Sequence, residues 1–384
     1  MRMMKLKDCC TIIAGQSPES KYYNTEGIGL PFFQGKADFG ELYPKIRVYC
    51  SQPTKVAEKD DILLSVRAPV GPTNLAPCKV CIGRGLTAIR PSEVLLTRYV
   101  LLFFRYFEAQ LASKGTGTTF KAITQDVVKN LEIPIPPLPE QERIVSRIEE
   151  LFSQLDAGVE TLNKTKAQLA VYRQAVLKEV FDSVTGKEYR IDDVCKEIKV
   201  GIVIKPTQYY VSSNGVCAFR NANVRRGYID DCDWVMISKE GHEKNRKSEV
   251  HTGDVLISRS GANLGMASAI SEKFDGYNAI DVVIAVPDKN VILPAYLAYY
   301  TNSPMGRSIV KKNERGAAQG HLNVTVYGRL PIVVPTLSEQ QNIISEIEGK
   351  LSICDSIEQT VETALQQAET MRQSILIDTF EGKF

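Results

Sequence analysis

Several signatures of catalytic and membrane proteins are missing from these 384 residues. There is no GxxxxGKS/T phosphate loop, which excludes the usual nucleotide-driven motor, and no GxGxxG strand–helix unit for a dinucleotide. No Asn-Pro-Pro-aromatic tetrad of an amino-methyltransferase occurs, and Asp60-Asp61 lacks the trailing Glu-x-Lys of a metal-dependent nuclease. The longest apolar run, Tyr99 to Phe104, is too short to span a bilayer. We therefore expect neither catalysis nor a membrane segment, and we interpret Asp60 and Asp61 as turn residues.

The chain also lacks a strong net charge and any ordered cysteine pattern. Its 47 basic and 45 acidic residues give a net charge of +2, so a nucleic-acid role would depend on local placement of charge. Nine cysteines without regular spacing predict a reducing, cytoplasmic compartment. The CxxC at Cys78–Cys81 has no histidine in its half of the chain, which favours structural thiols over a zinc site. The N-terminus has no long apolar core, so we expect no signal peptide.

What the sequence does contain is one long internal repeat. Residues 131–141 return as residues 330–340, a shift of 199 positions, and the same register continues to the C-terminus without a gap. This period is far longer than that of a solenoid repeat. The residues that recur in this register are Ile144, Ser146, Ile148, Glu149, Asp156, Arg173, Gln174, Leu177 and Phe181, as Ile343, Ser345, Ile347, Glu348, Asp355, Arg372, Gln373, Leu376 and Phe380. We therefore predict two copies of one module.

Each copy is expected to end in a long helix. Ser338 and Gln341 fit a capping box at the start of the second helix, and Pro139 stands at a position where a first turn tolerates proline. Apolar residues then follow a heptad pattern for about five heptads, which predicts a coiled-coil seam and helices of roughly 40 residues. A long core helix is the alternative, but an antiparallel pair suits this length better. The seam residues are Ile144, Ile148, Leu151, Leu155, Leu162, Leu169, Tyr172 and Val176, and then Ile343, Ile347, Cys354, Ile357, Val361, Ala364, Ala368, Met371 and Ile375.

The segments before the two helices resemble each other more faintly. Strand-like residues 60–67 parallel residues 253–259, and the aromatic-rich helix at 99–112 parallels 296–310. The predicted fold class is α+β, with two similar α+β globules separated by a long antiparallel two-helix coiled coil and related by a pseudo-two-fold repeat. The predicted globules are residues 1–138 and 185–337, and the predicted helical segments are residues 139–184 and 338–384.

Two similar globules on a helical spacer suit a ligand that repeats along its length, such as duplex DNA. Loops in both globules carry the cationic and amide side chains that bind phosphates and base edges. A solvated surface loop is the alternative for each cluster. The candidate DNA-binding residues are Gln34, Lys36, Arg67, Lys114, Thr116, Thr118, Thr119 and Lys121 in the first globule, and Arg220, Asn221, Asn223, Arg225, Arg226, Arg259, Lys311, Lys312, Arg315, Gln319 and His321 in the second.

The whole chain resembles the specificity subunit of type I restriction-modification systems. Residues 137–144, Pro-Leu-Pro-Glu-Gln-Glu-Arg-Ile, lead into a heptad helix and are duplicated as Thr-Leu-Ser-Glu-Gln-Gln-Asn-Ile at 336–343. The later Arg173-Gln174 and Arg372-Gln373 pairs add to the resemblance. The second copy departs from the common motif at Ser338, Gln341 and Asn342, but the capping pattern is kept.

The resemblance implies that each globule is a target recognition domain for one half of a split DNA sequence. The unlike loops of the two globules, Lys36 and Lys121 against Arg220 and Gln319, predict that this bipartite target is asymmetric. The resemblance also implies that the helices form the spacer and dock two methyltransferase subunits, which carry S-adenosylmethionine, while restriction subunits supply ATP-driven translocation. This chain would then be non-catalytic and hold no cofactor or metal. Two alternatives remain: a homodimeric coiled-coil scaffold with protein-binding heads, or part of a fused DNA methyltransferase.

Overall fold

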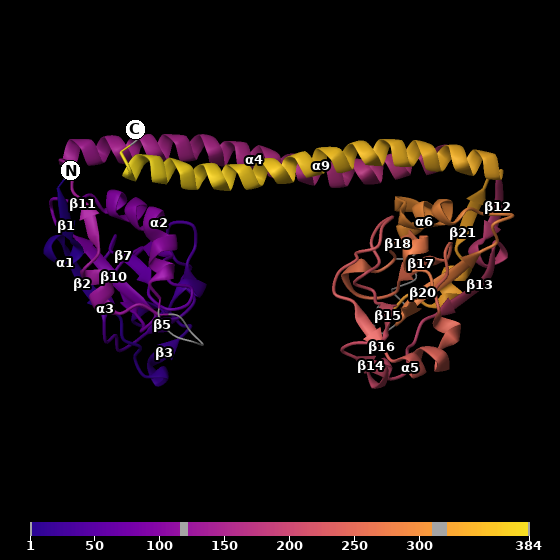
Figure 1. Ribbon diagram of the computed structural model, residues 1–384, viewed down its shortest axis with the longest axis horizontal. Coiled ribbons are helices and arrows are strands. Elements are labelled where there is room, and N and C mark those ends of the chain that lie inside the picture. Colours follow the sequence, from indigo (N-terminus) through magenta and orange to yellow (C-terminus); the bar gives the residue numbers. More distant parts are fainter. Residues whose placement is uncertain (1, 116–121, 309–320, 383–384) are drawn as a thin grey trace. The chain divides into compact units, whose positions relative to one another are not determined.

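The computed structural model describes residues 2–115, 122–308 and 321–382, and the chain divides into two compact units. Unit 1 comprises Met1–Leu162 and Thr363–Phe384, and unit 2 comprises Asn163–Glu362. Each unit contains one α+β globule and parts of two long helices, α4 (Leu138–Ser183) and α9 (Leu337–Phe380) (Figure 1). The predicted α+β class and its repetition are therefore confirmed. In the described part of the chain, no helix is long and apolar enough to cross a membrane.

The globule of unit 1 is organised around an antiparallel sheet with strand order β2-β10-β7-β8. A two-stranded sheet β1-β11 and a small sheet of order β3-β5-β4-β9-β6 lie beside it. Its helices are α1 (Leu6–Cys9), α2 (Thr97–Ser113) and α3 (Gln125–Lys129). The strands are β1 (Met3–Lys5), β2 (Cys10–Ala14), β3 (Tyr23–Asn24), β4 (Leu30–Phe33), β5 (Tyr49–Cys50), β6 (Val56–Ala57), β7 (Ile62–Ser65), β8 (Thr73–Leu75), β9 (Val80–Ile82), β10 (Leu86–Pro91) and β11 (Glu132–Pro134).

The globule of unit 2 repeats this plan with strand order β13-β20-β17-β18 and a two-stranded sheet β12-β21. A further sheet has the order β14-β16-β15-β19. Its described helices are α5 (Lys239–Lys244), α6 (Pro294–Asn302) and α8 (Val324–Gly328). The strands are β12 (Lys187–Arg190), β13 (Cys195–Val200), β14 (Tyr210–Val211), β15 (Val216–Phe219), β16 (Val235–Ile237), β17 (Val255–Ser258), β18 (Ala267–Ala269), β19 (Asn278–Ala279), β20 (Val282–Pro287) and β21 (Pro331–Val334).

The two globules match at the level of individual strand pairs. The four residues of β7 and the four of β17 are fully buried, because the sheet is covered on both faces. The parallel pairing of β4 with β9 recurs as the pairing of β15 with β19. Asp60, with a φ of 66°, is a left-handed turn residue before β7, in keeping with the sequence interpretation. The two globules therefore share one topology.

A buried glutamine joins each long helix to the globule that precedes it. Gln141 accepts a hydrogen bond from the Leu96 amide at 2.8 Å and donates to the carbonyls of Val94 and Pro136, both at 2.8 Å. Gln340, 199 positions later, accepts from the Leu293 amide at 2.8 Å and donates to two carbonyls at 2.9 Å. Both glutamines are 0% exposed. Leu96 and Leu293 precede α2 and α6, so one side chain fixes the starts of two helices in each unit.

The capping box of α9 lies two residues earlier than predicted. The Glu339 carboxylate accepts hydrogen bonds from the Thr336 backbone amide at 2.9 Å and from its hydroxyl at 2.7 Å. The Thr336 hydroxyl in turn accepts from the Glu339 amide at 3.4 Å. Ser338 and Gln341 were therefore the wrong pair. Their neighbour Gln340 is drawn into the globule, which brings the helix start forward to Leu337.

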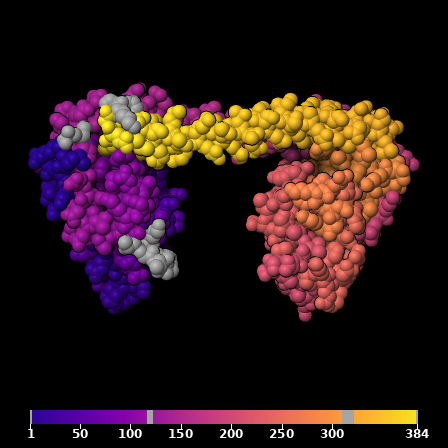
Figure 2. Space-filling model, viewed as in Figure 1, coloured from indigo at the N-terminus to yellow at the C-terminus, as the bar shows by residue number. Residues whose placement is uncertain are grey.

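Within each unit, α4 and α9 pack against each other inside one chain. In unit 2, Lys166 pairs with Glu362, Arg173 with Glu358, and Glu179 with Lys350. Residue numbers rise along α4 as they fall along α9, so the two segments are antiparallel, as predicted. Figure 2 shows this part of α9 lying on the unit 2 globule. Such pairing differs from the intermolecular contacts that a homodimeric scaffold requires.

One ion pair of this helix pair recurs in unit 1, with the partners exchanged between the helices. Arg372 on α9 pairs with Asp156 on α4 and stacks over the Phe152 ring, 4.6 Å from its centroid. In unit 2 the repeat-equivalent residues Arg173 and Asp355 pair in the same way. Side chains of Ile148 and Leu376 enter the core of unit 1 together with α2 and the four-stranded sheet. The repeat in sequence is thus matched by one repeated arginine–aspartate contact between the helices.

The seam differs from the predicted one at three positions. Tyr172, Ile357 and Met371 were expected in it but are 51%, 41% and 53% exposed. Their neighbours Arg173, Glu358 and Arg372 take the inward positions, so an apolar pattern could not identify these positions. The other expected residues divide into two groups. Ile144, Ile148, Leu169, Val176, Ile347, Cys354, Val361 and Ile375 are buried, and Leu151, Leu155, Leu162, Ile343, Ala364 and Ala368 are half-buried.

Replacing Gln340 by leucine should destabilise unit 2, because it leaves one amide and two carbonyls buried without partners. We expect a loss of roughly 2–4 kcal/mol and faster hydrogen exchange at the Leu293 amide. Urea unfolding and exchange mass spectrometry measure the two effects. The control is Gln341→Leu, at an exposed position of the same helix. Equal losses of unfolding free energy in the two variants would show that the Gln340 hydrogen bonds do not hold the helix to the globule.

The exchanged ion pairs should be measurably coupled. A double-mutant cycle on Arg372 and Asp156 is expected to give about 0.5–1 kcal/mol, because the side chains are 27% and 51% exposed and the arginine also covers Phe152. The comparison pair is Arg143 and Glu140, which lie on one helix and are both more than a third exposed. A coupling in the Arg372 cycle no larger than in this surface pair would contradict the proposed role in helix registration.

Candidate nucleic-acid interface

Four loops converge at one end of the four-stranded sheet in unit 1. The chain leaves β2 after Ala14 and β7 after Ser65, and both residues lie opposite the first residues of β10. β4 ends beside them, because the Gly83 amide donates to the Phe33 carbonyl at 2.8 Å. The register therefore brings together residues 15–18, 34–38, 66–70 and 83–85. The same end of the sheet in unit 2 gathers residues 201–206, 220–223, 259–263 and 279–281.

In unit 1 three of these loops, residues 34–38, 66–70 and 83–85, line a cavity of about 610 Å³. Gln34, Lys36, Arg67 and Arg84 line it, and all four are exposed. None of these side chains forms a hydrogen bond or ion pair with the residues that the structure describes. Three of the four were candidates from the sequence, and the structure brings them together.

The loops that carry these side chains are held by local hydrogen bonds. The Asp38 carboxylate accepts the Gln34 amide at 2.7 Å and closes the turn after β4. The Ser65 hydroxyl donates to the carbonyls of Arg67 and Pro69 at 3.1 and 2.8 Å. Backbone and turn bonds fix the loops, so the longer cationic side chains remain available to a ligand.

Arg84 was missed by the sequence reasoning, although a local signal exists. It stands between Gly83 and Gly85, and a Cβ on Gly85 would lie 2.2 Å from the Gln34 carbonyl oxygen. Only glycine permits this close approach of two loops. A Gly-Arg-Gly sequence directly before a buried strand is therefore a sign of a tight turn that displays an arginine.

The electrostatics of this end of unit 1 favour an anionic ligand. Lys36, Arg67 and Arg84 provide three cations, and Asp38 is the one carboxylate among the cavity residues. Nearby, burial raises the pKa of the Glu108 carboxyl above its usual value, against the opposing charges of Arg105 and Lys36. Exposed, unpaired cations on fixed loops are the groups that bind backbone phosphates.

Unit 2 uses the equivalent positions differently, because Asn221 is occupied in holding the loops together. Its side-chain amide donates to the Ser260 hydroxyl at 2.9 Å and to the Asp281 carbonyl at 3.0 Å. Its side-chain oxygen accepts the Arg259 amide at 2.7 Å and the Ser258 hydroxyl at 3.0 Å. Asn221 therefore fixes two neighbouring loops and has no polar capacity left for a base.

The other candidates of this loop are also bound internally. Asn223 is 1% exposed and bonds the Arg220 amide and the carbonyls of Asp230 and Cys232, which gives it a structural role in place of the expected DNA contact. Arg259 pairs with Asp281 at 3.1 Å. Arg220 donates to the Asp233 carbonyl. The charges of Arg220 and Arg259 remain at the sheet end, but these side chains are held by bonds within the protein, unlike the cations of unit 1.

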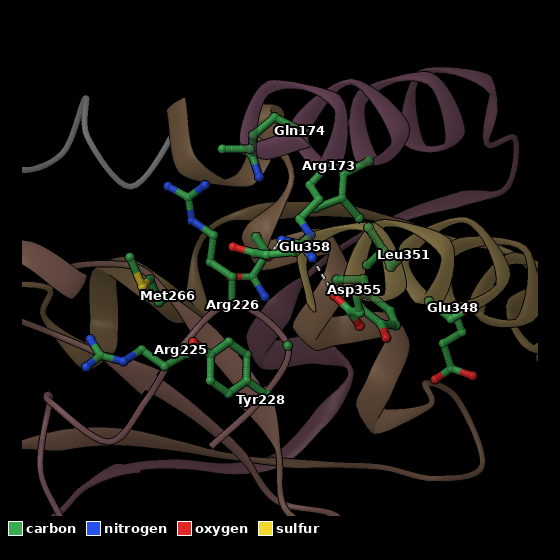
Figure 3. Close-up of a pocket in the computed structure, with 16 residues that line it drawn as sticks. Arg173, Gln174, Arg225, Arg226, Tyr228, Met266, Glu348, Leu351, Asp355 and Glu358 are labelled. Atoms are coloured by element: carbon green, nitrogen blue, oxygen red, sulfur yellow. Dashed lines mark hydrogen bonds and ion pairs between the residues drawn. The ribbon is translucent and has the colours of Figure 1, made fainter. Parts of the chain in front are cut away.

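Arg225 and Arg226 lie apart from this cluster, in a cavity of about 740 Å³ beside the helix pair of unit 2 (Figure 3). Arg225 pairs with Asp230 at 2.9 Å, and the exposed Arg226 extends from the same loop. Across the cavity α9 contributes Glu348, Asp355 and Glu358, and the last two pair with Arg173 of α4. The candidates Arg225 and Arg226 therefore lie beside the helix pair and not with Arg220 and Asn221 at the sheet end.

A smaller cavity of about 260 Å³ occupies the equivalent place in unit 1. Its helix residues Glu149, Phe152, Ser153 and Asp156 correspond through the repeat to Glu348, Leu351, Ser352 and Asp355 of the larger cavity. Arg98 and Arg105 of α2 line this cavity, whereas Tyr299 and Asn302 of α6 line the larger one in unit 2. Each helix pair therefore presents the same acidic turn to a hollow beside its globule.

The remaining candidates are more scattered. Lys114, at the end of α2, is exposed and lies over the Phe107 ring at 5.3 Å. His321 is exposed and precedes Leu322, whose amide donates to the Arg259 carbonyl at 2.8 Å, so it adjoins the sheet-end loops of unit 2. Outside the described residues lie Thr116, Thr118, Thr119, Lys121, Lys311, Lys312, Arg315 and Gln319.

The cysteines show no arrangement for metal binding where the structure can be described. Cys81 is fully buried on β9, and burial raises the pKa of its thiol to about 11. Cys78 is half-buried in the preceding turn. Among residues 2–115, 122–308 and 321–382, no group of three or more His, Cys, Asp or Glu side chains could hold a metal ion.

Comparison with known proteins gives a consistent family. The sequence model of one family, described as "Type I restriction modification DNA specificity domain", matches residues 1–170 and 176–367. A putative type I restriction enzyme MjaX specificity subunit of Methanocaldococcus jannaschii is 41% identical over 177 residues, which is 46% of this chain and 40% of that protein. The EcoBI specificity subunit of Escherichia coli is 26% identical over 319 residues, 76% of this chain and 67% of that protein.

Solved structures of similar proteins were also found. The HsdS subunit from Thermoanaerobacter tengcongensis is 49% identical, covers 41% of this chain and 38% of that chain, and has a TM-score of 0.38. The S subunit of a type I restriction-modification system from M. genitalium is 15% identical, covers 99% of this chain and 96% of that chain, and has a TM-score of 0.42. The alignments with the MjaX and HsdS proteins thus span less than half of those relatives.

The cationic end of unit 1 yields a direct test with duplex DNA. Lys36→Ala should weaken binding similarly on all sequences and should reduce the slope of log affinity against log salt by about one, because one phosphate contact is lost. The matched control is Lys79→Ala, an exposed lysine in the β8–β9 connection, away from the four loops. Fluorescence anisotropy over a salt series measures both. An unchanged slope for Lys36→Ala would remove this cavity from the interface.

Proposed function

The chain belongs to the type I restriction-modification DNA specificity family, and we propose that it selects the DNA site for such a system. Each unit would read one half of a bipartite target with the loops at the end of its four-stranded sheet. The observation that carries this proposal is the set of side chains Gln34, Lys36, Arg67 and Arg84 around one cavity in unit 1, which have no partner among the residues that the structure describes. Such groups hold a phosphate backbone and reach base edges.

The target is proposed to be asymmetric, because the two sheet ends differ in chemistry. Unit 1 offers unpaired cations and an amide, whereas in unit 2 Arg259 is paired with Asp281 and Asn221 is saturated. Direct readout depends on the donors and acceptors that a loop presents to the groove. Loops that present different groups at the same end of the same sheet would select different half-sites.

The helix pair is proposed to dock two methyltransferase subunits, and restriction subunits would join the full complex. The support is the repeated acidic turn, Glu149 to Asp156 and Glu348 to Asp355, which lines an equivalent hollow in each unit. Equivalent surfaces bind two copies of one partner. In this proposal the chain itself is non-catalytic and cytoplasmic, and S-adenosylmethionine and ATP are bound by the partners.

The proposal is tested by mapping methylated adenines in a host that expresses the modification subunit with and without this chain. We expect one bipartite, asymmetric motif to be methylated only when the chain is present. Arg67→Ala should relax the preference at one position of one half-site, with a loss of about 1–3 kcal/mol at that base pair if the arginine reads a base.

Two outcomes would contradict the proposal. Methyl transfer by the purified chain without a partner would show an enzyme, as in the fused-methyltransferase alternative. An identical methylation pattern with and without the chain would show that it does not select the site. Arg190→Ala, at an exposed residue of β12 outside the four loops, serves as the control and should leave the motif unchanged.

A further inference from the structure

Two neighbouring aliphatic side chains protrude from unit 2 at the sheet end. Ile204 is 80% exposed and Val203 is 49% exposed. Single exposed aliphatic residues are common on protein surfaces. These two are adjacent in sequence, and they belong to residues 201–206, one of the four loops that converge beside β20. Their place makes them part of any ligand contact made by those loops.

The base of this loop is fastened to the sheet. The Gly201 amide donates to the Val282 carbonyl at 2.9 Å, and the Ile202 amide donates to the Ala279 carbonyl at 2.8 Å. A Cβ on Gly201 would lie 2.4 Å from that same Ala279 oxygen, so the approach requires glycine. Ile202 is 5% exposed and anchors the loop in a small core. Beyond this anchor the chain projects Val203 and Ile204 outward.

The loop also adjoins the polar cluster of unit 2. The Asp281 amide donates to the Ile202 carbonyl at 3.1 Å, and the Asp281 carboxylate pairs with Arg259. Lys205 follows Ile204 with a left-handed φ of 45° and is itself exposed. An aliphatic pair is therefore flanked by a lysine on one side and by the Arg259 site on the other. That combination suits a ligand with an anionic backbone and apolar groups between its charges.

Unit 1 has a different sequence at the equivalent point. Its Gly15 and Gln16 amides donate to Leu86 and Ile82, as Gly201 and Ile202 do to their partners in unit 2. The next residues are Ser17 and Pro18 in place of Val203 and Ile204. The Ser17 hydroxyl accepts the Arg84 amide at 3.2 Å, so this loop serves to support the arginine. The aliphatic pair is thus a property of unit 2 alone.

We propose that Val203 and Ile204 read thymine in the half-site bound by unit 2, through contact with its C5-methyl group in the major groove. This inference rests on the proposed function and deepens it. Thymine is the one base of DNA that displays a methyl group there, and apolar side chains recognise it. Since Asn221 and Asn223 are occupied within the protein, unit 2 relies more on shape and apolar contact than unit 1 does.

The test replaces thymine by deoxyuridine, which lacks the methyl group, one position at a time in the mapped target. Binding is measured by fluorescence anisotropy with the chain assembled with its modification subunits. At one or two positions of the unit 2 half-site, we expect deoxyuridine to weaken binding about fourfold, the value of one buried methyl group. With Ile204→Ala the same substitution should change affinity less than twofold.

The matched control is Ile28→Ala, which removes an isoleucine that is 56% exposed on unit 1. It should leave the deoxyuridine effect in the unit 2 half-site unchanged. The inference is overturned if wild type and Ile204→Ala respond equally at every thymine, or if Ile204→Ala prevents assembly with the modification subunits, which would make the pair a protein contact. A chain that has no methylation target at all refutes the proposed function instead.

Discussion

Each long helix begins against a globule, and one buried glutamine of the helix forms hydrogen bonds to backbone groups there. This residue is Gln141 in unit 1 and Gln340 in unit 2. A buried amide without partners would cost free energy, whereas here its donor and acceptor atoms bind main-chain groups of the globule. The bonds reach the residue before α2 or α6, so the direction of the long helix and the position of the globule's helix are set together. The globule cannot rotate about the helix start without breaking them.

Charged residues inside the seam then set the helix register. Arg173 and Arg372 occupy inward positions where an aliphatic residue would pack more simply, and each pairs with an aspartate of the opposite helix within its own unit. Partly buried ion pairs add little stability, but a shifted register would leave both arginines unpaired. Specific pairing of this kind explains why the two helices tolerate charges in the seam. It also explains why the repeat keeps Asp156, Asp355 and both arginines at matching positions.

Sequence reasoning succeeded where a signal is local and periodic. The long helices and the buried strands β7 and β17 follow from patterns within a few turns of chain, and the repeat follows from comparing the two halves of the sequence directly. It failed where a polar residue has a distant partner. Arg173 and Arg372 displaced the expected Tyr172 and Met371 from the seam, and Asn223 proved to be a structural residue, because a sequence shows donors and acceptors but not what satisfies them. Arg84 was not predicted as a candidate for a similar reason, since its exposed position depends on the close approach of Gly85 to Gln34.

The two sheet ends show how one frame can carry different recognition chemistry. The loops are held largely by bonds to main-chain groups, such as those of Gly15 and Gly201 to the strand that begins beside them. Side chains beyond these anchors contribute little to the fold, so they can change without loss of stability. In unit 1 they are cations without a partner among the described residues, and in unit 2 they are an arginine bound to Asp281 and an aliphatic pair. The backbone groups that hold each loop are therefore distinct from the side chains that would contact a ligand. This distinction lets two copies of one module differ in what they bind.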